Sequence, residues 1–265
     1  KESIICGWKF INNKLKKYKS NFIPLDSEHF SIWSLIRNSN HEMISKIYLT
    51  ASGGPFLNKP KSKINNARIS DVIKHPNWNM GHKISVDSAT LMNKLFELIE
   101  ASKIFNLPIN KFDVIIHPKS YVHALVNFKN GLSKILIHDT QMEIPIFNSI
   151  FDKTTESYKK NKDINFKNLN GVNFIKPSSS IFPLFKLVKR YKRKDSYYEI
   201  ILVTVNDYFV TKFLNGNINF QKMQIKMLEK LKDPYLSKYY NKYPKKINDI
   251  YMIVNKIKNY LYEKE

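Results

Sequence analysis

The segment from His75 to Ala101, HPNWNMGHKISVDSATLMNKLFELIEA, constrains the chain most, because it joins an aromatic loop containing glycine to a helical pattern. Apolar residues at helical spacing predict one buried helix face: Met92, Leu95, Phe96 and Ile99. Asp87 and Ser88 precede this stripe, and each is a typical helix N-cap. We therefore expect a helix that begins near Asp87.

Asn93, Lys94 and Glu97 form a polar cluster on that helix, because residues three or four positions apart are neighbours on its surface. A helix N-terminus favours phosphate through its free N–H groups and its dipole. Ser88, Asn93 and Lys94 would add a hydroxyl, an amide and a cation, and Glu97 would suit a divalent cation beside them. The alternative is a surface helix in which Lys94 and Glu97 form an ion pair worth about 0.2–0.5 kcal/mol.

Two further carboxylates follow the segment Asn21–Leu25, NFIPL, which is typical of a short buried strand. Asp26 and Glu28 then lie where a strand ends and a helix starts, which is the usual position of ligands in α/β folds. Two positions apart in an extended segment, they would point to the same side. With Glu97 they would make an all-oxygen set suited to Mg²⁺ or Mn²⁺. Helix capping is the alternative for Asp26, although it does not explain Glu28.

A third segment, Tyr48–Phe56, has the sequence YLTASGGPF and predicts a short strand that runs into a turn at Gly53 and Gly54. A glycine pair lets backbone approach a ligand closely, and Ser52 could add a hydroxyl to a phosphate site. An ordinary Gly-Gly-Pro turn is the alternative.

Five motifs together resemble the 1-deoxy-D-xylulose 5-phosphate reductoisomerase family. They are KES at the start, LDSEH, LTASGGPF, HPNWNMGHKISVDSATLMNK and IIHPKSYVHALV. Their order and spacing cover residues 1 to about 145. The resemblance implies an NADPH-dependent oxidoreductase of the non-mevalonate isoprenoid route. Such an enzyme converts 1-deoxy-D-xylulose 5-phosphate to 2-C-methyl-D-erythritol 4-phosphate by metal-dependent rearrangement and reduction.

The resemblance also implies roles for individual residues. The catalytic positions are Lys1, Asp26, Glu28 and Glu97, and the metal ligands for Mn²⁺ or Mg²⁺ are Asp26, Glu28 and Glu97. The substrate-binding positions are Lys1, Ser27, Glu28, Ser52, His75, Trp78, Met80, Ser88, Asn93, Lys94 and Glu97, with Trp78 and Met80 on a mobile flap. Glu2 and Gly81 match positions that touch NADPH. His117 and His123 are interpreted as structural or supporting residues, and the remaining histidines receive no role.

The family's dinucleotide-binding part has no match in this sequence, because none of the seven glycines makes a Gly-x-Gly-x-x-Gly motif. We therefore expect a fragment whose NADPH domain is missing. Such a chain would bind metal and phosphate substrate weakly, would not hold NADPH and would not turn over. The resemblance further implies a homodimer. Within HDTQMEIP the chain departs from the family, with Thr140 and Gln141 in place of proline and aspartate and Glu143 in place of arginine.

The chain of 265 residues carries a formal net charge of +22 and a pI near 9.8, which would suit a nucleic-acid partner. Only four of its 44 basic residues are arginine, however, and base readout favours arginine. A nucleic-acid partner is therefore not favoured. The competing hypothesis remains a basic, non-catalytic module that retains the fold and binds nucleic acid or protein. One cysteine, Cys6, excludes an internal disulfide, and no run reaches the length of a membrane span. By analogy, the location would be a plastid-like organelle such as the apicoplast, or otherwise a bacterial-type cytoplasm.

The periodicity predicts an α/β (α+β) catalytic domain followed by a small C-terminal helical bundle. We expect residues 1–25 to be a helix and strand from a preceding domain, 26–150 the metal- and substrate-binding domain, 151–176 a connector and 177–265 the helical domain. A hairpin turn is expected at Asn130-Gly131, and IIHPKSYVHALV is expected to be a strand followed by the start of a helix. Three helices are expected from apolar stripes at 198–213, 223–231 and 250–261.

Overall fold

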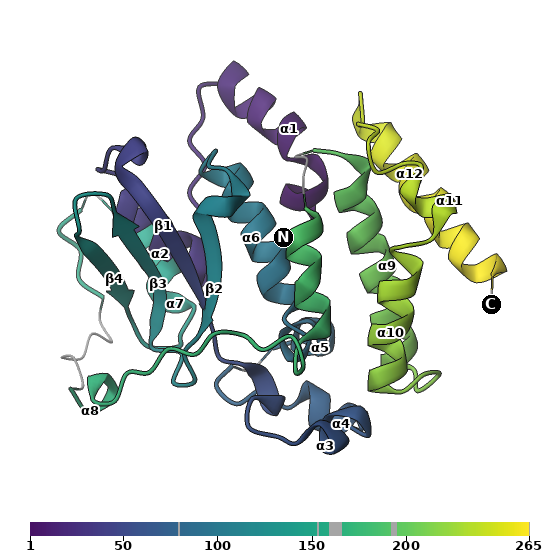
Figure 1. Ribbon diagram of the computed structural model, residues 1–265. Helices are drawn as coiled ribbons and strands as arrows, with labels where there is room; N and C mark the ends of the chain where they lie inside the picture. Colours follow the sequence, from purple (N-terminus) through teal and green to yellow (C-terminus); the bar gives the residue numbers. More distant parts are fainter. Residues whose placement is uncertain (79, 153, 159–165, 192–194, 265) are drawn as a thin grey trace.

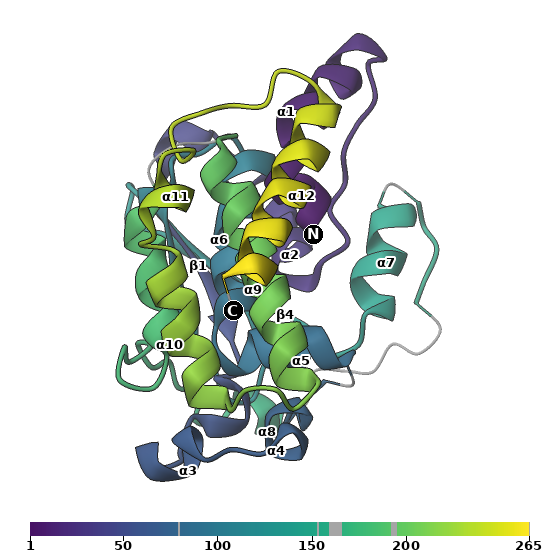
Figure 2. The same cartoon turned by 90° about the vertical axis from the view of Figure 1, so that its right-hand side faces the viewer.

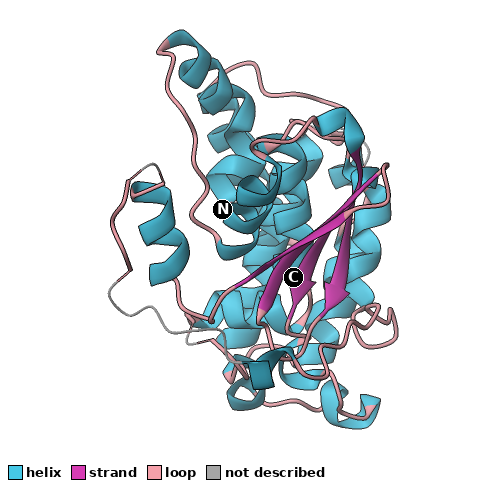
Figure 3. Ribbon diagram, turned by 90° about the vertical axis from the view of Figure 1, so that its left-hand side faces the viewer, coloured by secondary structure: helices cyan, strands magenta, loops and turns pink. Residues whose placement is uncertain are grey.

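A four-stranded mixed sheet forms one side of the molecule within the part of the chain that the computed structural model describes, which is every residue except 79, 153, 159–165, 192–194 and 265. Its strands are β1 (Ile44–Ala51), β2 (Phe112–Ile116), β3 (Val122–Phe128) and β4 (Ser133–Ile137), in the spatial order β2-β1-β3-β4. β2 runs parallel to β1, whereas β3 and β4 are antiparallel neighbours. Figure 3 shows the strands beside the helices.

Helices cover the sheet and continue the chain before and between its strands. α2 (Ser27–Ile36) packs on β3 and β4, and α6 (Met92–Ile104) packs on β1 and β2. Ahead of α6 the chain forms short helices: α3 (Lys61–Asn65), α4 (Ile69–Ile73) and α5 (His82–Ala89). After the sheet come α7 (Glu143–Ile150) and α8 (Phe166–Leu169). Figure 2 shows α7 at the edge of the molecule, and it contacts α2. Short 3-10 turns are η1 (His41–Met43), η2 (Gly54–Phe56), η3 (Ile109–Lys111) and η4 (Pro183–Arg190).

The carboxy-terminal part is helical, as the apolar stripes predict. Its helices are α9 (Tyr197–Leu214), α10 (Phe220–Lys230), α11 (Pro234–Ser237) and α12 (Ile247–Glu263). α9 is the centre of this group, because α10 and α12 both pack on it. α1 (Glu2–Lys17), at the other end of the sequence, lies against α6, α9 and α12, as Figure 1 shows. The structure thus confirms an α/β part followed by carboxy-terminal helices.

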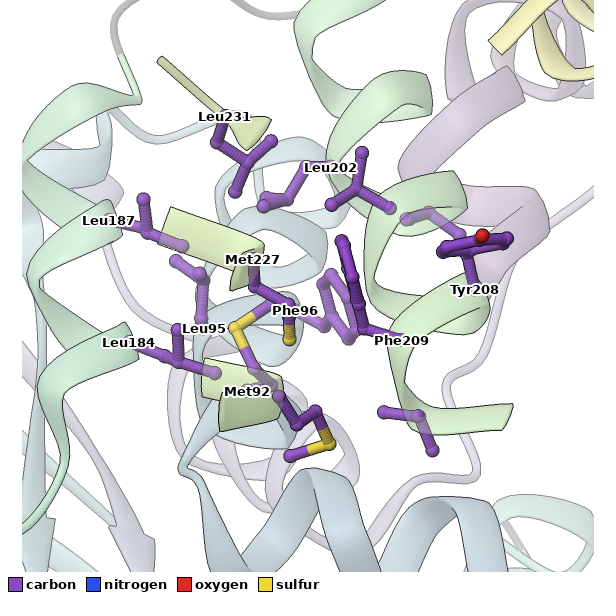
Figure 4. Close-up of a cluster of buried hydrophobic side chains, with 14 of the residues drawn as sticks. Met92, Leu95, Phe96, Leu184, Leu187, Leu202, Tyr208, Phe209, Met227 and Leu231 are labelled. Atoms are coloured by element: carbon purple, nitrogen blue, oxygen red, sulfur yellow. The ribbon is translucent and has the colours of Figure 1, made fainter. Parts of the chain in front are cut away.

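α6 lies at the centre of the whole molecule and joins its two hydrophobic cores. Leu98 and Ala101 face the core beneath the sheet, whereas Met92, Leu95 and Phe96 face the core shared with α9, α10 and η4, shown in Figure 4. A helix buried on nearly all sides is held in place from every direction. Functional groups on α6 therefore occupy fixed positions.

Three local predictions are wrong. Asn21–Leu25 has no regular structure, and no strand pairs with it among the described residues; Pro24 lacks the N–H that a strand ladder needs. The helix expected near Asp87 is two helices, because Leu91 takes a left-handed conformation (φ 59°) between α5 and α6. The helix start expected within IIHPKSYVHALV is absent, because Val122–Phe128 is a strand, as the expected hairpin requires. The expected hairpin between β3 and β4 is confirmed. No helix of the described part is long and apolar enough to cross a membrane.

Candidate functional site

Three carboxylates from two helices meet at one point. Asp26 is the N-cap of α2 and accepts a hydrogen bond from the backbone N–H of His29, 3.4 Å away. Glu28 lies in the first turn of α2, and Glu97 lies in the middle of α6. One oxygen from each carboxylate lies within 4.8 Å of the other two. The predicted trio is therefore assembled by a helix start and not by an extended segment, which corrects the expected local geometry of Asp26 and Glu28.

Two lysines contact this carboxylate trio. The Nζ atom of Lys94 donates a hydrogen bond to Glu28 and another to Oε2 of Glu97, 2.6 Å away. The Nζ atom of Lys1 lies 3.3 Å from Oε1 of Glu97 and 3.8 Å from Oδ2 of Asp26. Buried charges are tolerated when they are paired and hydrogen-bonded. The lysines thus offset much of the negative charge that the trio brings into the interior.

The surroundings of Asp26 and Glu28 favour their negative charge, whereas those of Glu97 do not. Burial would raise the pKa of Asp26, but His29, Lys1 and Lys94 hold it well below its ordinary value. Burial likewise opposes ionisation of Glu28, but Lys94 lowers its pKa. Burial outweighs Lys94 at Glu97 and raises its pKa. Since hard divalent cations such as Mg²⁺ and Mn²⁺ bind carboxylate oxygens, the chemistry of this donor set fits such an ion.

His29 supports the trio and was missed by the sequence analysis. Its Nδ1 lies 3.2 Å from Oδ1 of Asp26, and its Nε2 lies 2.9 Å from the backbone carbonyl oxygen of Glu97. The buried ring is therefore bonded to both helices that supply carboxylates. Burial would lower the pKa of His29, but the Asp26 carboxylate raises it to about 9. Its position three residues after Asp26 was the available signal, whereas its contact with Glu97 spans 68 residues.

The residues expected to bind phosphate line the same cavity of about 270 Å³ as the carboxylates. They are Ser52, His75, Ser88, Asn93 and Lys94. Ser52 follows the carboxyl end of β1, and its Oγ lies 3.0 Å from Nε2 of His75. Gly54 (φ 63°) passes so close to α5 that an added Cβ would lie 3.3 Å from the backbone oxygen of Ser88. The glycine turn thus lies directly against α5, and Ser52 and Ser88 line the same cavity.

Ser88 lies in the last turn of α5, so the expectation that Asp87 or Ser88 caps the next helix is wrong. Asp87 is buried and accepts a hydrogen bond from Nδ2 of Asn206 on α9, at 2.8 Å. Asn93 donates to Glu97 and accepts from Nζ of Lys1 at 2.5 Å. Asn93 and Lys94, expected on the phosphate side, are therefore in direct contact with the carboxylates.

Other predicted residues divide into those that line the cavity and those that do not. The cavity is also lined by Lys1, Ser27, Trp78 and Met80. His123, which we expected to be only a structural or supporting residue, lines it as well. Ser27 donates to Oε2 of Glu28 at 2.5 Å. Glu2 and Gly81 are not lining residues: Glu2 pairs with Lys83 at 2.8 Å, and Gly81 is the N-cap of α5.

His123 and His138 form a stacked pair that the sequence did not predict. Their ring centroids lie 3.6 Å apart, and Nε2 of His123 lies 3.0 Å from the backbone oxygen of His138. Trp78 stands edge-on to His123, with centroids 6.3 Å apart. His117 lies elsewhere and contacts the carbonyl oxygen of Asn173 at 3.2 Å.

The fold and this cavity together define an α/β domain whose carboxylate trio and polar pocket suit a divalent cation beside an anion. Residues 22–105 match the family model described as the 1-deoxy-D-xylulose 5-phosphate reductoisomerase C-terminal domain. Residues 138–260 match a second model, described as the DXP reductoisomerase C-terminal domain. The chain belongs to the 1-deoxy-D-xylulose 5-phosphate reductoisomerase family.

Individual relatives agree with this assignment. The chain is 50% identical over 250 residues to the reductoisomerase of Pelagibacter ubique (strain HTCC1062), covering 94% of this chain and 64% of that protein. It is 37% identical over 262 residues to the reductoisomerase of Sulfurihydrogenibium sp. (strain YO3AOP1), covering 98% of this chain and 66% of that protein. The chain thus spans slightly less than two thirds of these relatives.

A solved DOX-P reductoisomerase in complex with NADPH, fosmidomycin and magnesium superposes with a TM-score of 0.88 at 30% identity, covering 99% of this chain and 67% of that one. A second solved DOX-P reductoisomerase, in complex with magnesium, superposes with a TM-score of 0.86 at 26% identity, covering 99% of this chain and 67% of that one.

Proposed function

We propose that this chain carries the metal- and substrate-binding part of a 1-deoxy-D-xylulose 5-phosphate reductoisomerase. The complete activity would convert 1-deoxy-D-xylulose 5-phosphate to 2-C-methyl-D-erythritol 4-phosphate with NADPH, in non-mevalonate isoprenoid biosynthesis. The observation that carries the proposal is the single cavity in which Asp26, Glu28 and Glu97 face Ser52 and Ser88. Support comes from a solved family member that binds NADPH, fosmidomycin and magnesium.

Asp26, Glu28 and Glu97 would hold one Mg²⁺ or Mn²⁺ ion. Bound there, the ion would act as a Lewis acid toward the substrate's hydroxyl and carbonyl oxygens. The protein's part is to keep the three carboxylates in place. His29 does so by bonding to Asp26 and to the backbone of Glu97, because ligands are oriented by the groups behind them.

Ser52 is prepared to donate a hydrogen bond to a phosphate oxygen. The Nδ1 of His75 accepts from the backbone N–H of Asn77 at 3.2 Å and of Trp78 at 3.0 Å, so the ring proton lies on Nε2, facing Ser52. Burial and the charge of Lys94 lower the pKa of His75 to about 4, which keeps the ring neutral. Oγ of Ser52 also accepts from the N–H of Gly54 at 3.1 Å. Its own hydrogen is left for the ligand.

The remaining cavity residues would orient the substrate and exclude water. Lys1 and Ser27 would contact the sugar backbone, and Ser88, Asn93 and Lys94 would complete the phosphate pocket. Trp78 and Met80, on the loop before α5, would close over the substrate. Remote binding energy at the phosphate then positions the reacting end. Glu2 and Gly81 would lie toward NADPH, which supplies the hydride.

A homodimer joined through β4 would suit the sheet. Among the described residues β4 pairs with β3 alone, so one edge of β4 presents backbone groups that another strand could use. Ile135 on β4 is 44% exposed, and Leu132, just before β4, is 60% exposed. The relatives named above are bacterial, which favours a bacterial-type cytoplasm over a plastid-like organelle as the location.

Thermal unfolding with Mn²⁺ and fosmidomycin tests the proposal. Fosmidomycin is a phosphonate, so it should fill the phosphate pocket and reach the ion. We expect the rise in Tm with both ligands to exceed the sum of the rises with each alone, because each ligand strengthens binding of the other. Glu28→Gln should remove the excess. An additive rise in the wild-type chain, or steeply salt-dependent DNA binding in its place, would contradict the proposed function.

A further inference from the structure

A row of buried charged residues runs along α6 at intervals of three residues: Lys94, Glu97, Glu100 and Lys103. Consecutive members of this row are neighbours on the helix surface, but the row winds around α6, so Lys94 and Lys103 lie on opposite sides of the helix axis. Lys94 and Glu97 belong to the cavity already described. Lys103 does not, because it lies about 9 Å further along the helix axis than Glu97 and does not line the cavity. Its burial requires a separate explanation.

The ammonium group of Lys103 contacts three acceptors, on both of the helices that flank α6. Its Nζ donates to the backbone carbonyl oxygen of Ile5 in α1 at 2.7 Å, to Oε2 of Glu199 in α9 at 2.7 Å, and to Oδ1 of Asp195 at 3.0 Å. An ammonium has three protons to donate. Lys103 is therefore fully satisfied, and it ties α1, α6 and α9 together at one point.

The contacts around the Lys103 ammonium are buried and hydrogen-bonded. The side chains of Lys103 and Glu199 are both 0% exposed, and Tyr191 donates a further hydrogen bond to Glu199 at 2.6 Å. Asp195 reaches the ammonium from a left-handed backbone conformation (φ 58°), which costs energy in a residue other than glycine. A buried ion pair is weak evidence for stability, but it does favour one arrangement of the groups around it.

Ile5, which accepts a hydrogen bond from Lys103, lies at the same end of α1 as Lys1. The backbone N–H groups of Ile4 and Ile5 donate to the carbonyl oxygen of Lys1 at 3.0 and 3.2 Å, so Lys1 and Ile5 belong to the same helical turn. At the other end of that turn, Nζ of Lys1 reaches Asn93 and Glu97 on α6. The first turn of α1 is therefore attached to α6 twice, once through the cavity and once through Lys103.

A second contact holds the same turn from α5 and α9. Lys83 lies 2.8 Å from Oε1 of Glu2, 3.0 Å from Oδ1 of Asp207 and 3.5 Å from Oδ2 of Asp87. Glu2 is the neighbour of Lys1 in the sequence. α9 thus reaches the start of α1 through Glu199 and Lys103 and also through Asp207 and Lys83.

We propose that Lys103, held by Glu199, is a positioning residue that places Lys1 in the active site. The inference rests on the proposed function, since Lys1 matters there as a substrate contact. It also gives the carboxy-terminal helices a role in that site. Glu199 of α9 pairs with Lys103, and Lys103 in turn holds the first turn of α1. Lys103 itself does not line the cavity that holds the carboxylate trio.

The test is amide hydrogen exchange at Ile4 and Ile5 in the 265-residue chain. The Lys103→Met, Glu199→Gln double variant removes both charges, keeps the volume and leaves a partner for Tyr191. Because a hydrogen bond from a charged donor is lost, we expect these two amides to exchange about tenfold faster or more. We also expect fosmidomycin with Mn²⁺ to bind about tenfold more weakly, while inorganic phosphate, which does not need Lys1, binds as in the wild type.

Met227→Ala is the matched control, because it opens a cavity in the helical core beside α9 without touching Lys103. It should leave exchange at Ile4 and Ile5 unchanged. Unchanged exchange in the double variant would overturn the proposal, as would equal acceleration in both variants. If the double variant does not fold, Glu199→Gln alone must show faster exchange or the proposal fails. If wild-type chain binds no fosmidomycin, the proposed function fails, while the exchange rates still decide the role of Lys103.

Discussion

Nζ of Lys94 lies 2.6 Å from Oε2 of Glu97 and also donates to Glu28, so this lysine contacts two of the three carboxylates expected to hold a metal ion. The neighbouring carboxylates overcome the effect of burial and raise the pKa of Lys94 above its ordinary value. Lys94 therefore stays charged and competes with a divalent cation for Glu28 and Glu97. The same residue lines the pocket proposed for phosphate.

Replacing Lys94 should have opposite effects on the two ligands. In Lys94→Met, we expect Mn²⁺ to bind about tenfold more tightly, because a competing and repelling cation is removed. Inorganic phosphate should bind more weakly, because one of its cationic partners is lost. Isothermal titration of each ligand measures both effects. Lys129→Met, at an exposed position, is the control; Mn²⁺ affinity that is equal in the two variants would count against competition.

The buried His123 should make stability depend on pH. Burial lowers its pKa from 6.5 to about 4, and His138 acts in the same direction. The unfolded chain takes up this proton below pH 6.5, whereas the folded chain does so only near pH 4, so this contribution is complete above 6.5 and is lost as pH falls toward 4. The free energy of unfolding, measured with denaturant, should fall between pH 7 and pH 4 in both proteins. We expect this fall to be about 2–3 kcal/mol smaller in His123→Gln than in wild type. If the free energy of unfolding fell equally with pH in both proteins, this role of His123 would be refuted.

A charge on the edge strand should prevent dimer formation. Ile135→Lys places a cation on β4 without entering a core, because Ile135 is 44% exposed. We expect light scattering after size-exclusion chromatography to give a dimer for wild type and a monomer for this variant. Ile225→Lys, at a similarly exposed position on α10, should remain dimeric. A wild-type monomer at micromolar concentration would rule out a β4-mediated dimer.

NADPH should bind weakly to the 265-residue chain. The sequence contains no Gly-x-Gly-x-x-Gly motif, and the carboxylate of Glu2, one of the two positions matched to the cofactor, is engaged with Lys83. Calorimetric titration with NADPH should give no micromolar binding and, consequently, no turnover. Micromolar affinity would show that residues 1–265 hold the cofactor by themselves.

Much of the fold could be predicted because its signals are local. The apolar stripes of α10 and α12 repeat at helical spacing, because each of these helices buries one side. α9 is buried on nearly all sides, so its predicted stripe is only part of its buried surface. The split between α5 and α6 could not be predicted in the same way. No glycine or proline marks it, because the residue that takes the left-handed conformation there is a buried leucine, Leu91.

The site shows the same division. Asp26, Glu28 and Glu97 were found because motifs keep their residue types and order, and the structure brings them together. The contacts of His29 and Lys103, which hold the surrounding helices, were not predicted. His29 bonds to the backbone of Glu97, and Lys103 bonds to Ile5 and Glu199, across 68 to 98 positions. Such contacts depend on how α1, α2, α6 and α9 pack, which no local pattern records.

Mn²⁺ binding to Glu97→Gln, followed by electron paramagnetic resonance, tests the central claim most directly. Glu97 is the α6 member of the trio, and the exchange of one carboxylate oxygen for an amide removes a negative ligand while keeping the shape of the side chain. Wild-type chain should bind one Mn²⁺ at this trio, and Glu97→Gln should bind it at least about tenfold more weakly with an unchanged Tm. Glu229→Gln, at an exposed position on α10, is the control and should match wild type. Equal Mn²⁺ affinity in wild type and Glu97→Gln would contradict the assignment of the metal site.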